Sequence, residues 1–421
     1  LPRETRIHDL PAHEKTGMKR IGEEVSEQLA FEPGRVYVIR HVRYTYARVD
    51  ESLDPRDGSE PNVVTASKPD EGLPRCIAAP SLLAYIAVSK FADHLPLYRQ
   101  EGILHRSGVE LSRSSMCRWM QELATLCTPL LALMKKRMLQ SHVIQADETP
   151  VKQQAASGGG GKGPTKTCYF FSYVGDDDHP YILYDYQQGR SRAGPNGWFT
   201  DEHGQPNYHG HLQCDAYAGY NDLFAPATAA KPWALTPVGC LAHARRKFHD
   251  VRMQFPAACH HVLGQIKRLY EVEREARDLE PDVRRAMRHE RSRPIFEALL
   301  DWCEQQQRHT LPKSGLGEAI GYLLNQAEAL QRYLDDGQLA ADNNRCEASL
   351  RGIAIGRSNW MFMGSDAGGR AAAAMFSLIS SARRHDVEPL SYLTDVFTRL
   401  PATPISQLDQ FLPDRWQAPS N

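Results

Sequence analysis

The spacing of hydrophobic residues changes period along the chain, and these changes predict how the sequence is organised. From Pro80 to about Leu139, apolar residues recur at helical intervals, which predicts a set of helices. From Ser141 to Leu241 the pattern becomes strand-like, with β-branched and aromatic residues between polar turns. Beyond residue 250 the helical period returns and continues almost without interruption. The pattern therefore predicts a β-rich centre with helical regions before and after it.

The residues before Pro80 carry a weaker pattern. Apolar and polar residues alternate in Val36–Val42 as they do in a half-buried strand, so one strand is predicted there. Asp50–Pro74 is rich in Asp, Glu, Pro, Ser and Gly and holds few apolar residues. This composition predicts a linker or a long loop.

One segment of the first helical region combines a turn with a capped helix. Residues Val109–Met120 predict a turn, a serine cap at Ser112 and a short helix that carries Arg113, Arg118 and Trp119. This is the layout of a helix-turn-helix unit, whose second helix can enter the major groove of DNA. An ordinary helical bundle explains the same residues equally well, and both interpretations stay open.

The β-rich centre is predicted to contain five strands. They are His142–Asp147, Thr167–Val174, Tyr181–Tyr186, His211–Asp215 and Pro237–Leu241. The first three form an antiparallel meander, with a glycine-rich loop at Ser157–Gly163 between the first and the second. The fifth leads directly into a helix at Ala242–His249. Two of the strands end on an acid, Asp147 and Asp215.

The second helical region shows three apolar stripes that are most simply the core of a helical bundle. The stripes are Val262, Ile266, Leu269 and Tyr270; Ile295, Phe296, Leu299, Leu300 and Cys303; and Ile320, Leu323, Leu324, Ala327, Leu330 and Leu334. A further helix follows, capped at Asp342, carrying Glu347 and ending at Gly352 or Gly356.

Composition places the chain among ordinary globular proteins. A length of 421 residues predicts two or three domains, and 41% hydrophobic with 24% charged residues excludes a fibrous or wholly disordered chain. The sequence has no uninterrupted apolar run of membrane-spanning length and opens without a leader, so a cytoplasmic protein is expected. The formal net charge of −1 argues against a nucleic-acid partner on its own. Basic residues are nevertheless clustered locally, as at Lys135–Arg137 and Arg245–Lys247, although such clusters are usually solvated helix faces.

The nine cysteines are scattered, with no C-x-x-C pair, which is typical of reduced thiols inside a cell. Cys240 and His243 have the spacing of half a zinc site, but no second half accompanies them. Metal binding by this pair is therefore the weaker interpretation.

Three acids stand out by their predicted places. Asp147 and Asp215 end two strands, and Glu347 lies on a late helix. This order resembles the ribonuclease H-like fold, in which two acids on neighbouring strands meet a third from a helix packed across the sheet. A single aspartate at the end of a strand is more often a turn former, but the three together point to a catalytic set.

Such a set suits phosphodiester chemistry, whose transition state places extra charge on in-line oxygens. Two metal ions about 3.5 to 4 Å apart can stabilise the attacking and the leaving oxygen. Two Mg²⁺ ions are expected, with Mn²⁺ able to substitute, since Mg²⁺ prefers oxygen ligands. Asp147 is predicted to bridge both ions, with Asp215 and Glu347 each binding one. Lesser candidates for the same role are Glu148, Asp222, Asp250 and Asp342.

The chain resembles the insertion sequence sixty-six family of bacterial transposases from about residue 20 to its end. The resemblance is carried by Ala146–Val151, Gln213–Tyr220, Gly239–Phe248, Asp342–Arg351, Arg357–Asp366 and the alanine-rich stretch after Arg370. It implies an α/β fold: a ribonuclease H-like mixed sheet with a helical insertion, preceded by a helical, helix-turn-helix-like DNA-binding region.

The resemblance also implies a domain plan and roles for further residues. The plan is an N-terminal segment (1–50), a linker (51–75), a helical DNA-binding region (76–140), a DDE catalytic core (141–250 and 341–385) with a helical insertion (251–340), and a C-terminal tail (386–421). The expected DNA contacts are Arg113, Arg118, Arg245, Arg246, Lys247, Arg351 and Arg357. Cys240 and His243 match a C-x-x-H signature of such enzymes and, with Trp360, are given a supporting role.

Two departures from the family pattern affect these expectations. Family members carry paired cysteines near their start, whereas the corresponding stretches here are Ala12–Gly17 and Tyr46–Glu51, which contain none. A structural zinc in this degenerate zinc-binding region is therefore not supported. The family also tends to have a basic residue where this chain has Ser358.

The expected function is cleavage at the ends of a mobile element and transfer of the freed 3′ hydroxyls into target DNA. The expected partners are element ends, target DNA, at least one further copy of the chain and small accessory proteins of the same element, with no membrane. A decayed transposase that only binds DNA and a general nuclease of the same fold are the alternatives.

Overall fold

The computed structural model describes residues 34, 36–40, 44–47, 63–65, 72–74, 76–154, 164–227 and 234–419. By its contacts the chain divides into two units, Leu1–Val42 and Arg43–Asn421. Most of the degenerate zinc-binding region (1–50) and the glycine-rich loop at Ser157–Gly163 lie outside the described residues.

The strand predicted at Val36–Val42 is wrong where the structure describes it. Residues 36–40 lie in no strand, and all five are exposed, including Val38 with 92% of its surface accessible. An alternating pattern forms a strand when one of its faces is buried, and here neither face is. His41 and Val42 lie outside the described residues.

A short two-stranded ribbon precedes the first helix. Strand β1 (Thr45–Ala47) pairs antiparallel with β2 (Val63–Thr65), with Tyr46 opposite Val64. The second strand falls within the stretch predicted as a linker or loop, where the apolar pair Val63 and Val64 is the local signal for it.

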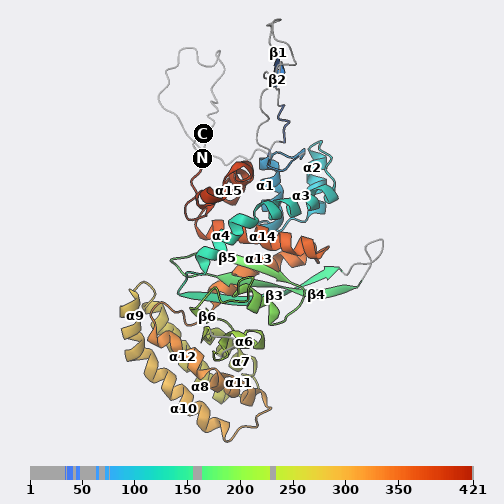
Figure 1. The fold of residues 1–421 in the computed structure, drawn as a ribbon. Helices are drawn as coiled ribbons and strands as arrows, with labels where there is room; N and C mark the ends of the chain where they lie inside the picture. The colour runs from blue at the N-terminus through green and yellow to red at the C-terminus, as the bar shows by residue number, and fades with distance from the viewer. Residues whose placement is uncertain are drawn as a thin grey trace, which may run out of the picture. The chain divides into compact units, whose positions relative to one another are not determined.

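A five-stranded mixed sheet forms the centre of the larger unit (Figure 1). Its strands are β3 (Val143–Gln154), β4 (Thr165–Val174), β5 (Ile182–Gln187), β6 (His211–Gln213) and β7 (Thr236–Val238), in the spatial order β5-β4-β3-β6-β7. The first three are antiparallel, as the meander prediction requires, and β6 and β7 run parallel to β3. The predicted α/β architecture with a mixed sheet is therefore confirmed.

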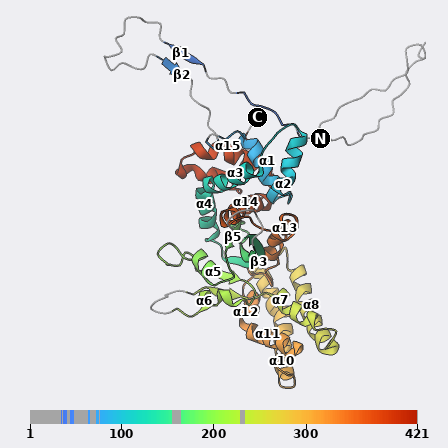
Figure 2. The ribbon, with the colours of Figure 1, turned by 90° about the vertical axis from the view of Figure 1, so that its right-hand side faces the viewer.

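Helices lie on both sides of this sheet, and two views agree on their placement (Figures 1 and 2). On one side are α1 (Pro80–Phe91), α2 (Leu97–Arg106), α3 (Arg113–Leu126), α4 (Thr128–Met138), α14 (Asp366–Arg384) and α15 (Pro389–Arg399). On the other are α7 (Leu241–Asp250), α8 (Pro256–Glu275), α9 (Pro281–Met287), α10 (Arg293–Gln307), α11 (Gly315–Asn325) and α12 (Ala327–Asp335). Short helices α5 (Ala193–Trp198) and α6 (Asn221–Phe224) lie in the loops around β6.

The helices before the sheet follow the predicted pattern. The hydroxyl of Ser112 accepts a hydrogen bond from the Ser115 amide at 3.2 Å, so the predicted serine cap at the start of α3 is confirmed. Trp119 on this helix is buried and belongs to the same core as α1, α14 and the sheet. The helical region is thus packed onto the sheet through a shared apolar interior.

The helices between residues 250 and 340 enclose a second core. Most residues of the three predicted stripes are buried in it, among them Val262, Ile266, Leu269, Phe296, Leu299, Cys303, Ile320, Leu323, Leu330 and Leu334. A short π-helix (Arg288–Ser292) links α9 to α10. The buried guanidinium of Arg288 donates to both carboxylate oxygens of Glu273, at 2.8 and 2.6 Å. This buried pair fixes α9 and α10 against α8.

Helix α13 (Asn344–Trp360) packs on β3 and β4 and is longer than predicted. The chain does not leave the helix at Gly352 or Gly356, because both lie within the packed helix, and a Cβ at Gly356 would meet the Trp360 indole at 2.6 Å. The helix ends at Met361, whose φ of 65° reverses the backbone.

The segment after residue 386 also contributes to the core. Tyr392, Val396 and Phe397 of α15 are buried against α1, and the 3₁₀ turns Leu400–Ala402 and Ile405–Phe411 follow. In the described part of the chain, no helix is both long enough and apolar enough to span a bilayer.

Candidate active site

Asp147 lies inside the central strand and not at its end. Strand β3 continues to Gln154 because β4 pairs with it from Gln145, opposite Val174, to Gln154, opposite Thr165. The prediction that this strand ends on Asp147 is therefore wrong. Only the parallel partner β6 stops early, at Gln213 opposite Gln145, and this opens the sheet beside the Asp147 carboxyl group.

Asp215 follows β6 by two residues, just as Asp147 follows the matched position on β3 by two. Its carboxylate accepts a hydrogen bond from the Tyr217 amide at 3.0 Å, which starts a short 3₁₀ turn (Ala218–Tyr220). The parallel pairing of β3 with β6 ends at Gln145 and Gln213. Each aspartate lies two residues beyond this last pair, so the two lie at the same level of the sheet.

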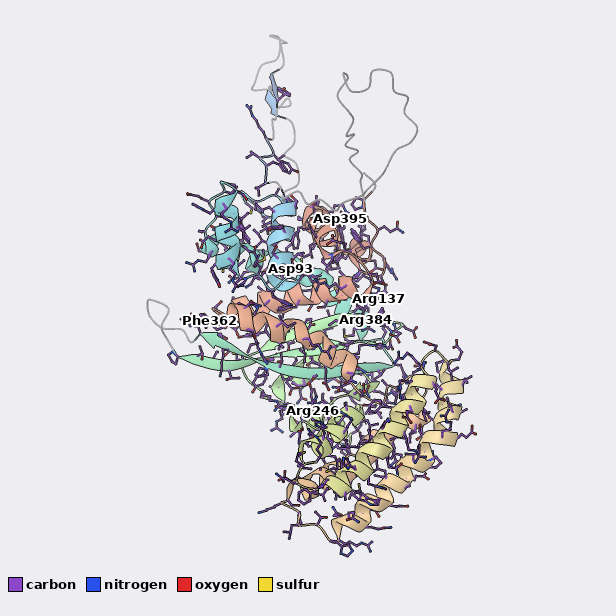
Figure 3. The ribbon with its side chains drawn as sticks, turned by 180° about the vertical axis from the view of Figure 1, so that it is seen from behind. Asp93, Arg137, Arg246, Phe362, Arg384 and Asp395 are labelled. Carbon is purple, nitrogen blue, oxygen red and sulfur yellow. The ribbon has the colours of Figure 1, made fainter. Side chains whose placement is uncertain are left out.

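Glu347 lies in the first turn of α13, the helix that packs across β3 and β4. Its Oε1 lies 3.5 Å from Nδ1 of His243, and its Oε2 lies 3.3 Å from a guanidinium nitrogen of Arg246. Both partners belong to α7, so two helices from distant parts of the sequence meet at this carboxylate. Figure 3 shows Arg246 on the insertion side of the sheet.

The three acids act on one another electrostatically. Burial, together with the charges of Glu148, Asp215 and Glu347, raises the pKa of Asp147 to about 7. A carboxyl group that shares its surroundings with other acids is harder to ionise, and a nearby cation reverses this effect. The structure thus brings the three sequence-predicted acids into one electrostatic neighbourhood.

Glu148 is the acid next to Asp147 in sequence, and it has a partner of its own. Its side chain is 2% exposed and accepts hydrogen bonds from Arg190 Nε at 2.8 Å and from the Tyr220 hydroxyl at 3.1 Å. Burial raises the pKa of Glu148, and the Arg190 guanidinium opposes this rise. Arg190 also lies over the Tyr217 ring at 3.8 Å. Glu148 is therefore neutralised by a fixed arginine.

Arg190 is a site residue that sequence reasoning missed. It follows β5, the far strand of the meander, and no spacing in the sequence connects it with Asp147 or Glu148. A basic residue directly after a strand was the available signal, and many surface residues share it.

The remaining lesser candidates take part in other contacts. Asp222 pairs with Arg192 at 3.2 Å. Asp250 lies exposed at the end of α7. Asp342 accepts from the Tyr270 hydroxyl at 2.7 Å and from the Asn344 amide at 3.1 Å. The N-cap of α13 is Asn343, one residue after the predicted cap, and the last contact lies in the turn that leads into the helix.

Cys240 and His243 lie beside Glu347, and a ligand atom from each of the three lies within 4.8 Å of the others. Burial lowers the pKa of His243, although Glu347 and Asp215 act in the opposite direction. Among the described residues, neither His243 Nδ1 nor Glu347 Oε1 has a hydrogen-bond partner, although both atoms are buried. An unsatisfied buried carboxylate oxygen suits a cation, and the acids present are the hard oxygen donors that Mg²⁺ prefers.

The basic residues predicted to contact DNA fall into two groups. Arg245, Arg246, Lys247, Arg351 and Arg357 belong to α7 and α13, the helices beside the acids. Arg357 donates to the Thr149 hydroxyl at 3.0 Å and to the Pro150 carbonyl at 2.8 Å, so it is held against β3. An open cleft of about 580 Å³ near these helices is lined by Arg245 and Arg246 with His249, Asp250, Tyr270 and Asn344.

The second group lies on α3, where both arginines are next to acids of the same helical region. Arg113 pairs with Glu101 at 3.0 Å, and Arg118 lies 3.7 Å from Glu122. Trp360, which was given a supporting role, lies at the far end of α13, about 20 Å along the helix from Glu347 at 1.5 Å per residue. The structure does not bring these three residues to the acids.

Three family models match consecutive parts of the chain. The model described as Transposase IS66 family matches residues 75–371, and the IS66 C-terminal element matches residues 377–413. The zinc-finger binding domain of transposase IS66 matches residues 13–47, a stretch that contains none of the nine cysteines.

Similar full-length proteins are found in Sinorhizobium fredii. The uncharacterized protein y4qI is 34% identical over 405 residues, which cover 93% of this chain and 71% of that protein. The uncharacterized protein y4jD is 31% identical over 410 residues, covering 95% of this chain and 77% of its own length. These relatives and the family models together cover the sheet, the insertion and the helices on both sides of it. The chain belongs to the IS66 family of transposases.

Proposed function

We propose that this chain is a DDE transposase that cuts DNA at element ends and joins the 3′ hydroxyls to target DNA. The observation that carries the proposal is the meeting of Asp147, Asp215 and Glu347 around one opening in the sheet, where the latter two raise the pKa of the first. The strand order, an antiparallel meander followed by two parallel strands, supports a ribonuclease H-like fold for this core.

In this proposal Asp147, Asp215 and Glu347 would hold two Mg²⁺ ions, with Asp147 as the ligand shared between them. The ions supply positive charge to the attacking and leaving oxygens of the phosphodiester. Asp147 would bind the ions as a carboxylate, because their positive charge would oppose the burial and the neighbouring acids that raise its pKa. The Oε1 atom of Glu347 accepts no hydrogen bond from a described residue and offers a ligand position beside His243.

The residues around the acids hold and orient them. His243 and Arg246 lie on two sides of Glu347 and restrict its rotation. Glu148 forms a wall of the site, where Arg190 pairs with its carboxylate. Arg245 and Arg351, both exposed, contact phosphates and position the DNA without reading its sequence.

The domain plan follows from the same proposal. Residues 141–250 and 341–385 form the catalytic core, 251–340 the helical insertion, and 76–140 a helix-turn-helix-like region that binds element ends. Residues 1–50, 51–75 and 386–421 act as an end-binding segment, a linker and a C-terminal tail. At least two copies assemble in the cytoplasm, since two ends must be cut and joined together.

A second candidate is a decayed transposase that binds DNA without cutting it. The stretch that matches the zinc-finger model has lost every cysteine, which is the observation in favour of decay. The three acids remain in place, and this favours the enzyme.

The test is cleavage and strand transfer on a labelled element-end duplex with Mg²⁺ or Mn²⁺. Asp215→Ala is expected to lower the rate by at least about a thousandfold, because a metal-held charge is worth several kcal/mol in the transition state. The matched control is Asp282→Ala, an acid on the insertion whose side chain is 91% exposed. Equal activity of Asp215→Ala and the unaltered chain would reject the proposal. Binding of the duplex without cutting by either protein would favour the decayed form.

A further inference from the structure

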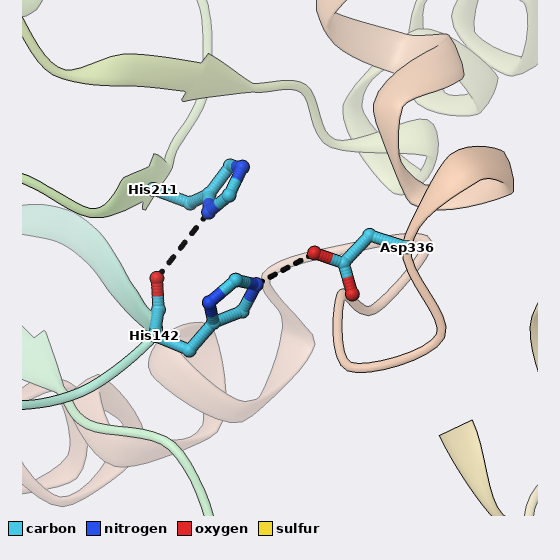
Figure 4. A group of neighbouring side chains, drawn as sticks. All are labelled: His142, His211 and Asp336. Carbon is cyan, nitrogen blue, oxygen red and sulfur yellow. Dashed lines mark hydrogen bonds and ion pairs between the residues drawn. The ribbon is translucent and has the colours of Figure 1, made fainter. Parts of the chain in front are cut away.

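A second group of side chains that could hold a metal ion lies at the start of the two acid-bearing strands (Figure 4). His142 directly precedes β3, His211 opens β6, and Asp336 follows the last residue of α12. His142 lies five residues before Asp147 and His211 four before Asp215, so about 13 to 16 Å of strand separate the two groups. The histidine group is therefore distinct from the candidate active site.

The three side chains already face one another. His142 Nε2 lies 2.6 Å from Oδ2 of Asp336, and the two imidazole rings lie with their centroids 4.7 Å apart. One ligand atom from each residue lies within 4.8 Å of the other two. A small movement of the side chains would allow all three atoms to surround one zinc ion, each at the usual zinc–ligand distance of about 2.0 to 2.2 Å for imidazole and carboxylate.

Two of the three ligands are oriented by their remaining polar atoms. The His142 carbonyl lies 3.3 Å from Nδ1 of His211 and accepts its proton, which leaves a lone pair on Nε2. The other carboxylate oxygen of Asp336 accepts from the Gln338 amide at 2.8 Å, which leaves Oδ2 for a ligand bond. Metal-binding histidines and carboxylates are held by partners of this kind in proteins.

The backbone that carries His142 is fixed as well. Its amide donates to Asp176 at 2.6 Å, and its carbonyl accepts from the Tyr208 hydroxyl at 3.2 Å and from the His211 amide at 3.0 Å. The two histidines are thus connected by main-chain hydrogen bonds at the start of a parallel strand pair. Such rigidity lowers the entropy that the side chains lose on binding an ion.

We propose that His142, His211 and Asp336 bind a zinc ion, with water as the fourth ligand. Two nitrogens and one oxygen are a donor set that zinc accepts and that Mg²⁺ disfavours. The side chains of His142 and Asp336 are 40% and 27% exposed, which leaves an entry path and room for the water. The site is independent of the zinc-finger match at residues 13–47.

The proposed ion would fix one end of a segment whose other end carries Glu347. Between Asp336 and Glu347 the chain runs along the sheet, where Gln213 donates to the Ala340 carbonyl at 2.7 Å and Gln145 donates to the Asp342 carbonyl at 3.1 Å. Bound zinc therefore ties the starts of both acid-bearing strands to the segment that leads into α13.

The test uses the full chain, freed of metal with a chelator and then titrated with zinc. The titration is made in an Asp147→Asn, Asp215→Asn, Glu347→Gln background, which removes the acids of the candidate active site and the carboxylate shared with Cys240 and His243. This background is expected to bind one zinc ion tightly and to gain thermal stability from it. His211→Gln or Asp336→Asn is expected to weaken that binding at least tenfold and to abolish the gain.

His209→Gln is the matched control, because His209 is exposed, lies two residues from His211 and does not belong to the group. Circular dichroism of the metal-free proteins shows whether each variant is folded. If His211→Gln does not fold, the isosteric Asp336→Asn still tests the proposal. Unchanged zinc binding in the folded variants, or an equal loss in His209→Gln, would overturn the proposal. Neither outcome depends on whether the chain transposes DNA.

Discussion

Gln145 on β3 donates a 2.9 Å hydrogen bond to Gln213 on β6, across the parallel pair that positions Asp147 and Asp215. Gln145 is 8% exposed and Gln213 is fully buried. Gln213 also donates to the carbonyls of Gly239 and Ala340. The amide pair therefore couples the two acid-bearing strands to the segment that precedes α13.

Replacing one of these amides is expected to destabilise the fold. Gln213→Leu takes the Gln213 amide away from the Gly239 and Ala340 carbonyls and leaves the Gln145 amide with only the Asp342 carbonyl. Each buried group left unsatisfied costs about 1 to 3 kcal/mol. Urea unfolding should therefore give a free energy of unfolding lower by at least about 2 kcal/mol. Gln205→Leu, at an exposed position, is the control and should change it by less than about 0.5 kcal/mol. Equal stability of both variants would contradict the buried network.

Arg190 is expected to stabilise the fold by neutralising Glu148. Arg190→Ala leaves a 2% exposed carboxyl group beside Asp147 without its charged partner. We expect a loss of about 1 to 3 kcal/mol at neutral pH, measured by urea unfolding, and a smaller loss in acid, where Glu148 is protonated. Arg192→Ala is the control, because Arg192 is 70% exposed and pairs with Asp222 at the surface. A loss that does not vary with pH would contradict this explanation.

The stability of the metal-free chain should depend on pH through Asp147. Its folded pKa of about 7 lies above the unfolded value of about 4, so the folded state binds more protons between these values. This contribution therefore falls as pH rises from about 4 to 7, and it stays constant above that range.

Asp147→Asn should remove this loss. The difference in free energy of unfolding, Asp147→Asn minus the unaltered chain, is expected to increase between pH 4 and 7. Urea titrations without divalent ions measure it. Asp282→Asn serves as the exposed control. A parallel pH dependence of the unaltered chain and Asp147→Asn would show that Asp147 ionises normally.

Arg246 is expected to contribute a phosphate contact in addition to its contact with Glu347. Arg246→Ala should reduce the slope of log K against log salt for DNA binding by about 1 and weaken binding to all sequences alike. The measurement is fluorescence anisotropy at several salt concentrations. Arg291→Ala, on the insertion, is the control. An unchanged slope would exclude Arg246 from the interface.

Met361 holds a backbone conformation that favours glycine. With φ at 65° and ψ at −46°, the backbone is strained by the presence of a Cβ atom. Met361→Gly should therefore stabilise the fold by about 1 kcal/mol. Thermal unfolding measures this, with Met361→Ala as the control that keeps the Cβ atom and therefore most of the strain. Equal effects of the two substitutions would rule out relief of strain as the cause.

Patterns in the sequence predict the sheet and its helices because burial imposes the periods on which those predictions depend. The strands from His142 to Val238 and the apolar stripes of the insertion follow from alternation and from helical spacing. The ends of elements are harder to predict, since they depend on partners. Strand β3 continues beyond Asp147 because β4 pairs with it as far as Gln154, and α13 continues beyond Gly356 because that glycine packs against Trp360.

The candidate site likewise has residues that the sequence predicts and contacts that it does not. Three acids in a particular order are visible in the sequence, and their predicted roles remain proposals. The Arg190 contact with Glu148 and the meeting of His142, His211 and Asp336 depend on loops that only the folded chain places. No period or local motif encodes contacts between residues so far apart.

The sheet presents no free edge on the β5 side, since the serines of α14 already occupy it. The amides of Ile182 and Tyr184 donate to the hydroxyls of Ser381 and Ser377 at 3.0 and 2.9 Å. Another chain cannot extend the sheet by adding a strand along these amides. A second copy of the chain therefore cannot associate by strand addition along β5, and misassembly by that route is blocked on this side of the sheet.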